Sequence, residues 1–347
     1  MNQLFRWDQT GCFLLALAAG ILPFAVPEVC AAALREGLTL CSGPLLLSLF
    51  PFLVVSRLLV QCPESDLLAM PFRLAAWGIG IRTPCAARVL CIGFLGGFAP
   101  AASAAAQAVR TGQLTAEEAD ALLPACICSG PSFVVLTVGQ SLLGSAELGV
   151  LLFASQITAN YLTAALLNRF AGVHSVEQES AAPASPAPPR LDEILADAAI
   201  TYCKLCGFIL FFRLLAAGAG ALLPAGAGTL CAILLEVCSG CDLASRTGRW
   251  GSLLCCAALS VQGLSVLLQV RTICPAEISL RPLLAARAVH LPLSVALFWL
   301  GSTVPVQAVQ TFTTLTERVV VLRRVPLDCA LLAFAVCCIT VEELARS

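Results

Sequence analysis

The chain has 347 residues, of which 59% are hydrophobic and only 12% charged, and its formal net charge is −1. Its mean hydropathy is +0.91. So few charges cannot cover an aqueous surface, which excludes an ordinary soluble domain. A helical membrane span takes about 20 apolar residues, so the length accommodates about eight to ten spans. The scattered arginines and the near-zero charge give no reason to expect a nucleic-acid partner. We therefore expect an all-α polytopic helix bundle in a lipid bilayer.

The amino-terminal segment, residues 1–40, predicts a retained first helix rather than a cleavable signal sequence. Its apolar run from Gly11 to Ala33 contains Glu28 as its single charged residue. This run is longer than the apolar core of a typical signal sequence and long enough to cross a bilayer. A second span is predicted from Leu38 to Val60. Residues 66–81, which contain arginine, tryptophan and proline, favour a position flat on the membrane interface.

Two interrupted apolar stretches and a clean span at 146–170 complete a first unit, residues 41–170. Gly-Gly-Phe-Ala-Pro at 96–100 divides the run 86–109 into two arms of about ten residues, each too short to cross alone. This pattern predicts either a re-entrant hairpin or one broken helix. Cys-Ser-Gly-Pro-Ser at 128–132 interrupts the run 121–143 in the same way.

A polar linker rich in proline and alanine, residues 171–193, lies near the midpoint of the chain. The second unit, residues 194–303, repeats the order of features of the first. The sequence PFLVVSRLLV at 51–60 resembles GFILFFRLLA at 207–216, and interrupted segments at 230–248 and 259–267 precede a closing span at 283–301. The C-terminal segment, 304–347, contains an apolar run at 327–341 that is short for a span.

The topology depends on the first interrupted segment of each unit. If both are re-entrant, each unit crosses the membrane three times and the two units are inverted; full crossings would make them parallel. In the re-entrant arrangement most of the 20 basic residues fall on the side of the amino terminus. The positive-inside rule makes that side cytoplasmic. We expect a multi-pass integral membrane protein whose amino terminus is cytoplasmic, with re-entrance left open.

The four interruptions mark a candidate binding site. Backbone that leaves the helix at membrane depth lines a polar cavity or packs against protein. Half-helix amino termini suit anionic groups, whereas freed carbonyls suit cations or hydrogen-bond donors. Close helix packing is the alternative for any one glycine, but the repeated order favours a transporter site. The candidate substrate-binding residues are Gly97, Pro100, Ser129, Ser132, Glu236, Ser239, Gly240, Gln262, Ser265, Gln269, Arg287 and His290.

Alternative roles remain open for three charged or titratable candidates. Glu236 is costly at membrane depth, so it could bind a coupling proton or cation, or pair with Arg213. Arg287 and His290 are three residues apart on one helix face, where both could meet an anion or anchor the helix at the interface. Arg57 and Arg213 are expected to be paired or to extend to the interface rather than to bind substrate.

The sequence gives no sign of an enzyme or of a cofactor. Nineteen cysteines are present, but most lie in apolar runs, where a thiol packs like a small hydrophobic group. The Cys203/Cys206 and Cys238/Cys241 pairs lack four-ligand spacing, so we expect packing rather than metal or redox chemistry. His-Glu-x-x-His, Gly-x-Ser-x-Gly and Walker motifs are absent from the sequence.

Three stretches of the second unit are similar to a known family: LLEVCSGCDLAS at 234–245, GLSVLLQV at 263–270 and RPLLAARAVH at 281–290. They resemble the sporulation integral membrane proteins of the YlbJ type, within the group that carries the nucleoside-recognition Gate domain. GGFAP and SGPSF in the first unit resemble the family's proline breaks, although Ala99 precedes the proline as an extra residue and Gly130 replaces an asparagine. The resemblance covers most of the chain.

The resemblance implies export of dipicolinic acid across the mother-cell or outer forespore membrane during sporulation. It also implies paired hairpins and an elevator-like or rocking cycle. The expected partners are a small anionic or polar solute, the bilayer and a coupling proton or cation, with a homo-oligomer left open. A carrier of nucleosides or other metabolites and a non-transporting scaffold of the spore envelope remain alternatives.

Overall fold

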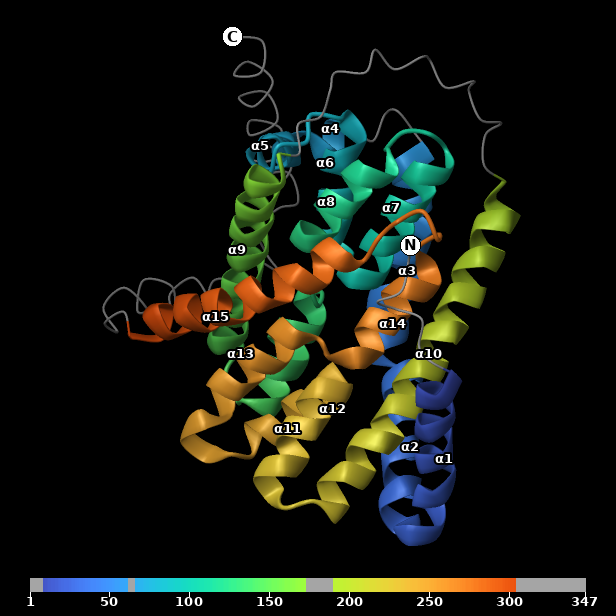
Figure 1. The fold of residues 1–347 in the computed structure, drawn as a ribbon, viewed down its shortest axis with the longest axis vertical. Helices are drawn as coiled ribbons and strands as arrows, with labels where there is room; N and C mark the ends of the chain where they lie inside the picture. Colours follow the sequence, from blue (N-terminus) through green and yellow to red (C-terminus); the bar gives the residue numbers. More distant parts are fainter. Residues whose placement is uncertain (1–8, 62–65, 173–189, 304–347) are drawn as a thin grey trace, which may run out of the picture.

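The computed structural model describes residues 9–61, 66–172 and 190–303, and every element in these ranges is a helix (Figure 1). Residues 173–189 of the linker lie outside the described residues. The C-terminal segment 304–347, with its run at 327–341, also lies outside them.

Four helical stretches in the described part of the chain are long and apolar enough to cross a membrane, and a bent pair near the amino terminus would make a fifth. The fold is therefore compatible with a polytopic membrane helix bundle, which confirms the coarse prediction. The four stretches are α9 (Ala146–Ala171), α10 (Leu191–Leu222), Gly248–Ile273 and α15 (Arg281–Thr303).

The amino-terminal region differs from the prediction of one helix over 11–33 and a span over 38–60. The chain forms α1 (Gln9–Ala25), α2 (Pro27–Ser42) and α3 (Pro44–Gln61). The first two meet at a bend of 115°. Val26 leaves the helical conformation and Pro27 starts α2, because proline fits the first turn of a helix better than its interior. Gly43 separates α2 from α3 in a non-helical conformation.

The first unit continues with short helices and then two interrupted ones. Residues 66–78 form α4 (Asp66–Ala69), the 3₁₀-helix η2 (Met70–Phe72) and α5 (Arg73–Gly78). The run over 86–109 is a helical hairpin whose arms α6 (Pro84–Gly96) and α7 (Phe98–Arg110) pack along each other. Its turn is Gly97. The run over 121–143 forms α8 (Ala116–Cys126) and the π-helix η3 (Ser132–Leu142), separated by residues 127–131.

The second unit begins with the long helix α10. After α10 comes a hairpin of α11 (Ala225–Leu235) and α12 (Val237–Ser245), whose arms pack together around Glu236. The next stretch comprises η4 (Gly248–Trp250), α13 (Gly251–Val261) and α14 (Gly263–Ile273). Gln262 interrupts it in the left-handed conformation, at φ 61°. α15 closes the unit.

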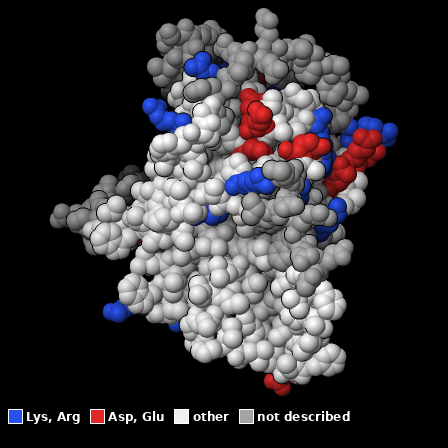
Figure 2. All heavy atoms as spheres, in the orientation of Figure 1, with Lys and Arg blue, Asp and Glu red and all other residues white. Residues whose placement is uncertain are grey.

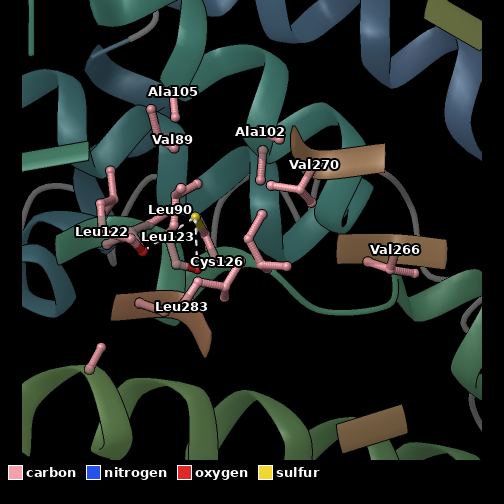
Figure 3. Close-up of a cluster of buried hydrophobic side chains, with 14 of the residues drawn as sticks. Val89, Leu90, Ala102, Ala105, Leu122, Leu123, Cys126, Val266, Val270 and Leu283 are labelled. Carbon is pink, nitrogen blue, oxygen red and sulfur yellow. Dashed lines mark hydrogen bonds between the residues drawn. The ribbon is translucent and has the colours of Figure 1, made fainter. Parts of the chain in front are cut away.

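The largest buried cluster joins helices from both units (Figure 3). Val89 and Leu90 of α6 and Ala102 and Ala105 of α7 lie in it, together with side chains of α8, α14 and α15. Seven buried alanines give α7 a narrow profile that lets its backbone approach α3, α6 and α14 closely. The α6–α7 hairpin therefore sits in the interior of the fold, with Gly97 at its tip.

Candidate functional site

The four interruptions pack in two pairs, each pair within one unit. A Cβ atom on Gly97 would lie 2.7 Å from the amide nitrogen of Gly130, so the α6–α7 tip rests on the break between α8 and η3. A Cβ atom on Gly263 would lie 2.9 Å from the amide nitrogen of Glu236, so the α11–α12 tip rests on the break between α13 and α14. Both glycines have positive φ angles of 80° and 70°, which a side chain would disfavour.

One cavity of about 540 Å³, counting its open mouth, lies against both hairpin tips. Gly96 and Phe98 flank Gly97 on its wall, and Ser129 and Gly130 contribute the adjoining break. Glu236 contributes the second tip. The remaining wall is mostly apolar and comes from α3, η3, α10, α12 and α14, through Leu45, Leu49, Ser132, Phe133, Ile209, Val237, Cys238, Val266 and Gln269.

Glu236 is 2% exposed, and its carboxylate caps α12. Oε1 accepts a hydrogen bond from the Cys238 amide at 2.8 Å, and Oε2 accepts bonds from the Ser239 amide at 2.7 Å and the Ser239 hydroxyl at 2.9 Å. Three donors and the positive end of the helix dipole stabilise a negative charge at this position. The α12 amino terminus is therefore occupied by the protein's own carboxylate.

The alternative in which Glu236 pairs with Arg213 is wrong. Arg213 pairs with Glu36 of α2, with Nη2 and Oε2 2.6 Å apart. Arg57 of α3 pairs in the same way with Asp197 of α10 at 2.6 Å. These arginines therefore join opening helices to their neighbours, as expected for paired residues rather than ligands. Glu236 forms no ion pair with any residue in the described ranges.

The helices α7 and α14 begin differently from α12, because no side chain caps either of them. The α7 cap position is Gly97, which has no side chain to offer, and the α14 cap position is Gln262. Uncapped helix amino termini attract anionic groups through their free N–H groups and the helix dipole. The site thus combines a buried carboxylate with the start of α7, where Phe98 lines the cavity, whereas the start of α14 rests on the α11–α12 tip.

A buried amide oxygen without a partner lies on the α14 side of the cavity. Gln269 is 1% exposed; its Nε2 donates to the Ser265 hydroxyl at 2.8 Å, and its Oε1 has no hydrogen-bond partner in the described structure. The Oε1 atom of Gln262, at the break before α14, is also buried and unpartnered, but Gln262 does not line the cavity. A buried acceptor without a donor costs about 1–3 kcal/mol, so a solute that donates hydrogen bonds there would gain affinity.

Four other predicted residues lie in the walls of the site rather than facing its space. Gly97 and Gly240 permit close approach of backbone, since a Cβ on Gly240 would lie 2.8 Å from the Cα of Ile233 in the opposite arm of the hairpin. Pro100 is buried in the first turn of α7 against Gly96. Ser239 holds the Glu236 carboxylate.

Arg287 and His290 lie outside the cavity wall and bind backbone instead. Arg287 Nη2 donates to the Ile127 carbonyl at 2.6 Å, and Nη1 is 3.4 Å from the Ser260 carbonyl. Ile127 begins the break after α8, and Ser260 lies just before the break at Gln262. One guanidinium of α15 therefore satisfies carbonyls at the interrupted helices of both units.

His290 extends this network to α9. Its Nδ1 lies 3.5 Å from Arg287 Nη1, which can only donate, and its Nε2 lies 3.3 Å from the Gln156 carbonyl, which can only accept. This pair of neighbours requires the neutral tautomer with the proton on Nε2. Gln156 in turn donates to the Ser260 hydroxyl at 3.0 Å.

The sequence prediction missed Gln156 and Ser260, which complete this network, and the apolar wall of the cavity. Gln156 and Ser260 carry no motif, and an apolar wall residue looks like any other residue of a span. Asn160, one turn beyond Gln156 on α9, is buried with both side-chain polar atoms unpartnered.

The comparisons with known proteins give no assignment. No family model, no curated protein and no solved structure matches this chain.

Proposed function

We propose that this chain is an integral membrane transporter for a small polar or anionic solute. The observation that carries the proposal is the convergence of two hairpin tips, each resting on an interrupted helix, against one cavity that contains a buried carboxylate. Interrupted backbone of this kind is expected in a bilayer only where it lines a cavity or packs against protein. Paired interruptions at corresponding places in two halves are typical of transporter binding sites.

The order of helices supports two structural repeats related by inversion. Each unit has a long opening helix, a helical hairpin, an interrupted helix and a closing helix. With both hairpins re-entrant, the opening, interrupted and closing helices would give three crossings per unit, and an odd number inverts the second unit. An inverted pair offers the two exchangeable arrangements that alternating access requires.

The charges of the site favour different ligands in its different parts. An anionic solute would place a carboxylate near the uncapped start of α7 and away from the Glu236 carboxylate, because like charges repel at short range in a low-dielectric site. Glu236 would then face a coupling proton or cation, or the donor groups of the solute. Ser129, Ser132 and Gln269 on the wall supply uncharged hydrogen bonds.

Dipicolinate, the substrate implied by the family resemblance, is the first solute to test. It is a planar dianion, and one of its carboxylates would suit the uncapped start of α7. The protein is reconstituted into lipid vesicles, and uptake of dipicolinate is compared with that of a nucleoside. We expect saturable uptake of dipicolinate that Glu236→Gln abolishes while the protein remains folded. Glu193→Gln, an exposed carboxylate on the first turn of α10, is the matched control and should transport normally.

The outcomes separate the alternatives. Uptake of the nucleoside but not of dipicolinate would retain the transporter and replace the substrate. Failure to move either solute by correctly folded protein, with the same result in the Glu193→Gln variant, would favour the scaffold. If Glu236→Gln leaves uptake unchanged, Glu236 takes no part in binding the solute or a coupling ion.

A further inference from the structure

One side of α9 carries a line of polar residues in the interior of the fold. Gln156, Asn160 and Thr163 follow one another at helical spacing, and Asn168 lies two turns beyond Asn160, so all four project from the same side of the helix. Each of them is buried. We call these four residues the polar face of α9.

The polar face of α9 would lie at a depth where lipid, rather than water, surrounds the fold. α9 is one of the stretches long and apolar enough to cross a membrane, and Asn160 is close to the middle of this helix. Figure 2 shows Lys, Arg, Asp and Glu side chains concentrated over the upper part of one face of the molecule, while the lower part is almost entirely uncharged. Buried polar groups inside such an apolar zone must be satisfied by the protein or by bound molecules.

Both ends of the polar face have partners on neighbouring segments. Gln156 Nε2 donates to the Ser260 hydroxyl of α13 at 3.0 Å. Asn168 Nδ2 donates to the Ile79 carbonyl at 2.8 Å and to the Ala121 carbonyl of α8 at 3.2 Å. The two end amides therefore fix α9 to α13 and to α8.

The middle of the polar face differs, because its polar atoms have no partner. Both polar atoms of the Asn160 amide and the Thr163 hydroxyl are buried without a hydrogen-bond partner in the described part of the chain. These residues are 1% and 0% exposed. Oε1 of Gln156, one turn from Asn160, is also buried and unpartnered. Most buried polar groups in proteins are paired, so four such atoms on successive turns of one helix indicate a bound ligand.

The chemistry of these atoms identifies the class of ligand. The Asn160 amide contains an acceptor oxygen and a donor nitrogen, and the Thr163 hydroxyl can both donate and accept. A metal cation would use the oxygens but leave the Asn160 nitrogen unpaired, whereas an inorganic anion would use the donors but leave the amide oxygens unpaired. Water donates and accepts, and a buried water molecule typically makes about three hydrogen bonds.

We propose that the middle of the polar face of α9 is a binding site for ordered water, held by the Asn160 amide, the Thr163 hydroxyl and Oε1 of Gln156. The bound water would complete the polar contacts of α9 between its fixed ends, at Ser260 of α13 and Ala121 of α8. This site is separate from the cavity at the hairpin tips, whose wall contains none of these residues. The inference does not depend on what the protein transports.

The direct test is a structure of the full-length protein in lipid nanodiscs, at a resolution that shows ordered water. We expect density at hydrogen-bond distance, about 2.7–3.2 Å, from the Asn160 amide and the Thr163 hydroxyl. A map that shows ordered water elsewhere in the interior but none at these two residues would overturn the proposal. A map in which another side chain of the protein satisfies Asn160 would overturn it as well.

Thermal melting of N160L/T163V in detergent gives a second, independent test. These substitutions replace polar groups by apolar groups of similar size. If the site binds water, the variant loses hydrogen bonds, and we expect its melting temperature to fall by about 2–4 °C. If the site is dry, the variant removes unpaired groups and its melting temperature rises, which would overturn the proposal.

The matched control for the threonine is T229V on α11, whose hydroxyl already donates to the Ala225 carbonyl of the same helix at 2.9 Å. Because this hydroxyl is exposed, we expect its loss to change the melting temperature by less than about 1 °C. N168L removes an amide with two protein partners and should lower the melting temperature whether or not water binds. If N160L/T163V does not fold, the map of the native protein decides the question by itself.

Discussion

Replacing Arg287 with alanine removes a side chain that holds carbonyl groups at the interrupted helices of both units. The bond to Ile127 is short at 2.6 Å, and that to Ser260 is long at 3.4 Å. A hydrogen bond to a charged group contributes about 1.5–3 kcal/mol, and a buried carbonyl left unpaired costs about 1–3 kcal/mol. Since the long bond adds little, we expect the free energy of unfolding to fall by about 2–4 kcal/mol.

Thermal unfolding in detergent, followed by tryptophan fluorescence, measures this loss. For a chain of this size the expected decrease in melting temperature is about 3–6 °C. Arg287→Lys should lose roughly half as much, because an ammonium group can reach one carbonyl but cannot span both. The control is Arg169→Ala, an exposed arginine in the last turn of α9, which should change stability by less than about 1 kcal/mol.

Two results would refute this reasoning. A melting temperature of Arg287→Ala within about 1 °C of the native value would mean that the carbonyls do not depend on the guanidinium. A solute that raises the melting temperature of the native protein should raise that of Arg287→Ala as well, since the arginine binds backbone. Loss of that shift would instead make Arg287 a direct ligand of the solute.

Three further predictions concern backbone contacts and one loop. Gly97→Ala forces a Cβ to within 2.7 Å of the Gly130 amide at a positive φ, so we expect about 2 kcal/mol or more of destabilisation and loss of uptake. Gly149→Ala, whose Cβ would lie 2.8 Å from backbone of η3, should also lower the melting temperature, whereas Gly207→Ala meets nothing within 4 Å and should not. The carboxylate of Asp120 accepts a hydrogen bond at 2.7 Å from the backbone amide of Ser279, in the loop before α15. Asp120→Ala removes this acceptor and should lower the free energy of unfolding by about 1–3 kcal/mol, as measured by thermal melting. Asp120→Asn keeps an acceptor oxygen and should lower it less.

The features of the fold that follow from hydropathy could be predicted from the sequence. The long spans at 146–170 and 283–301, and interruptions near 96–100 and 128–132, match helices and breaks of the structure. Hydropathy could not place the bend at Val26, because an apolar run has the same composition whether it is straight or bent. It also could not decide between a hairpin and a broken helix at Gly97, since this choice depends on packing between the two arms.

The predictable parts of the candidate site are the residues that are energetically unfavourable in an apolar helix. Glu236 in an apolar run and the glycines at the breaks both contradict the local pattern, and both lie at the cavity or its wall. The role of Arg287 was not predictable, because its spacing from His290 fits a ligand pair as well as it fits two residues that bind backbone. Long-range partners such as Ile127 and Gln156 decide between these, and they depend on the tertiary fold.

The contacts between hairpin tips and interrupted helices are made by bare backbone at Gly97 and Gly130, and again at Gly263. Interlocked side chains resist sliding because each must leave its groove, and each loses many small dispersion contacts on the way. Smooth glycine surfaces impose no such barrier. Separating a tip from its interrupted helix would therefore draw no glycine side chain out of a groove, whereas the buried Val89 and Leu90 of α6 anchor the body of the first hairpin in the core.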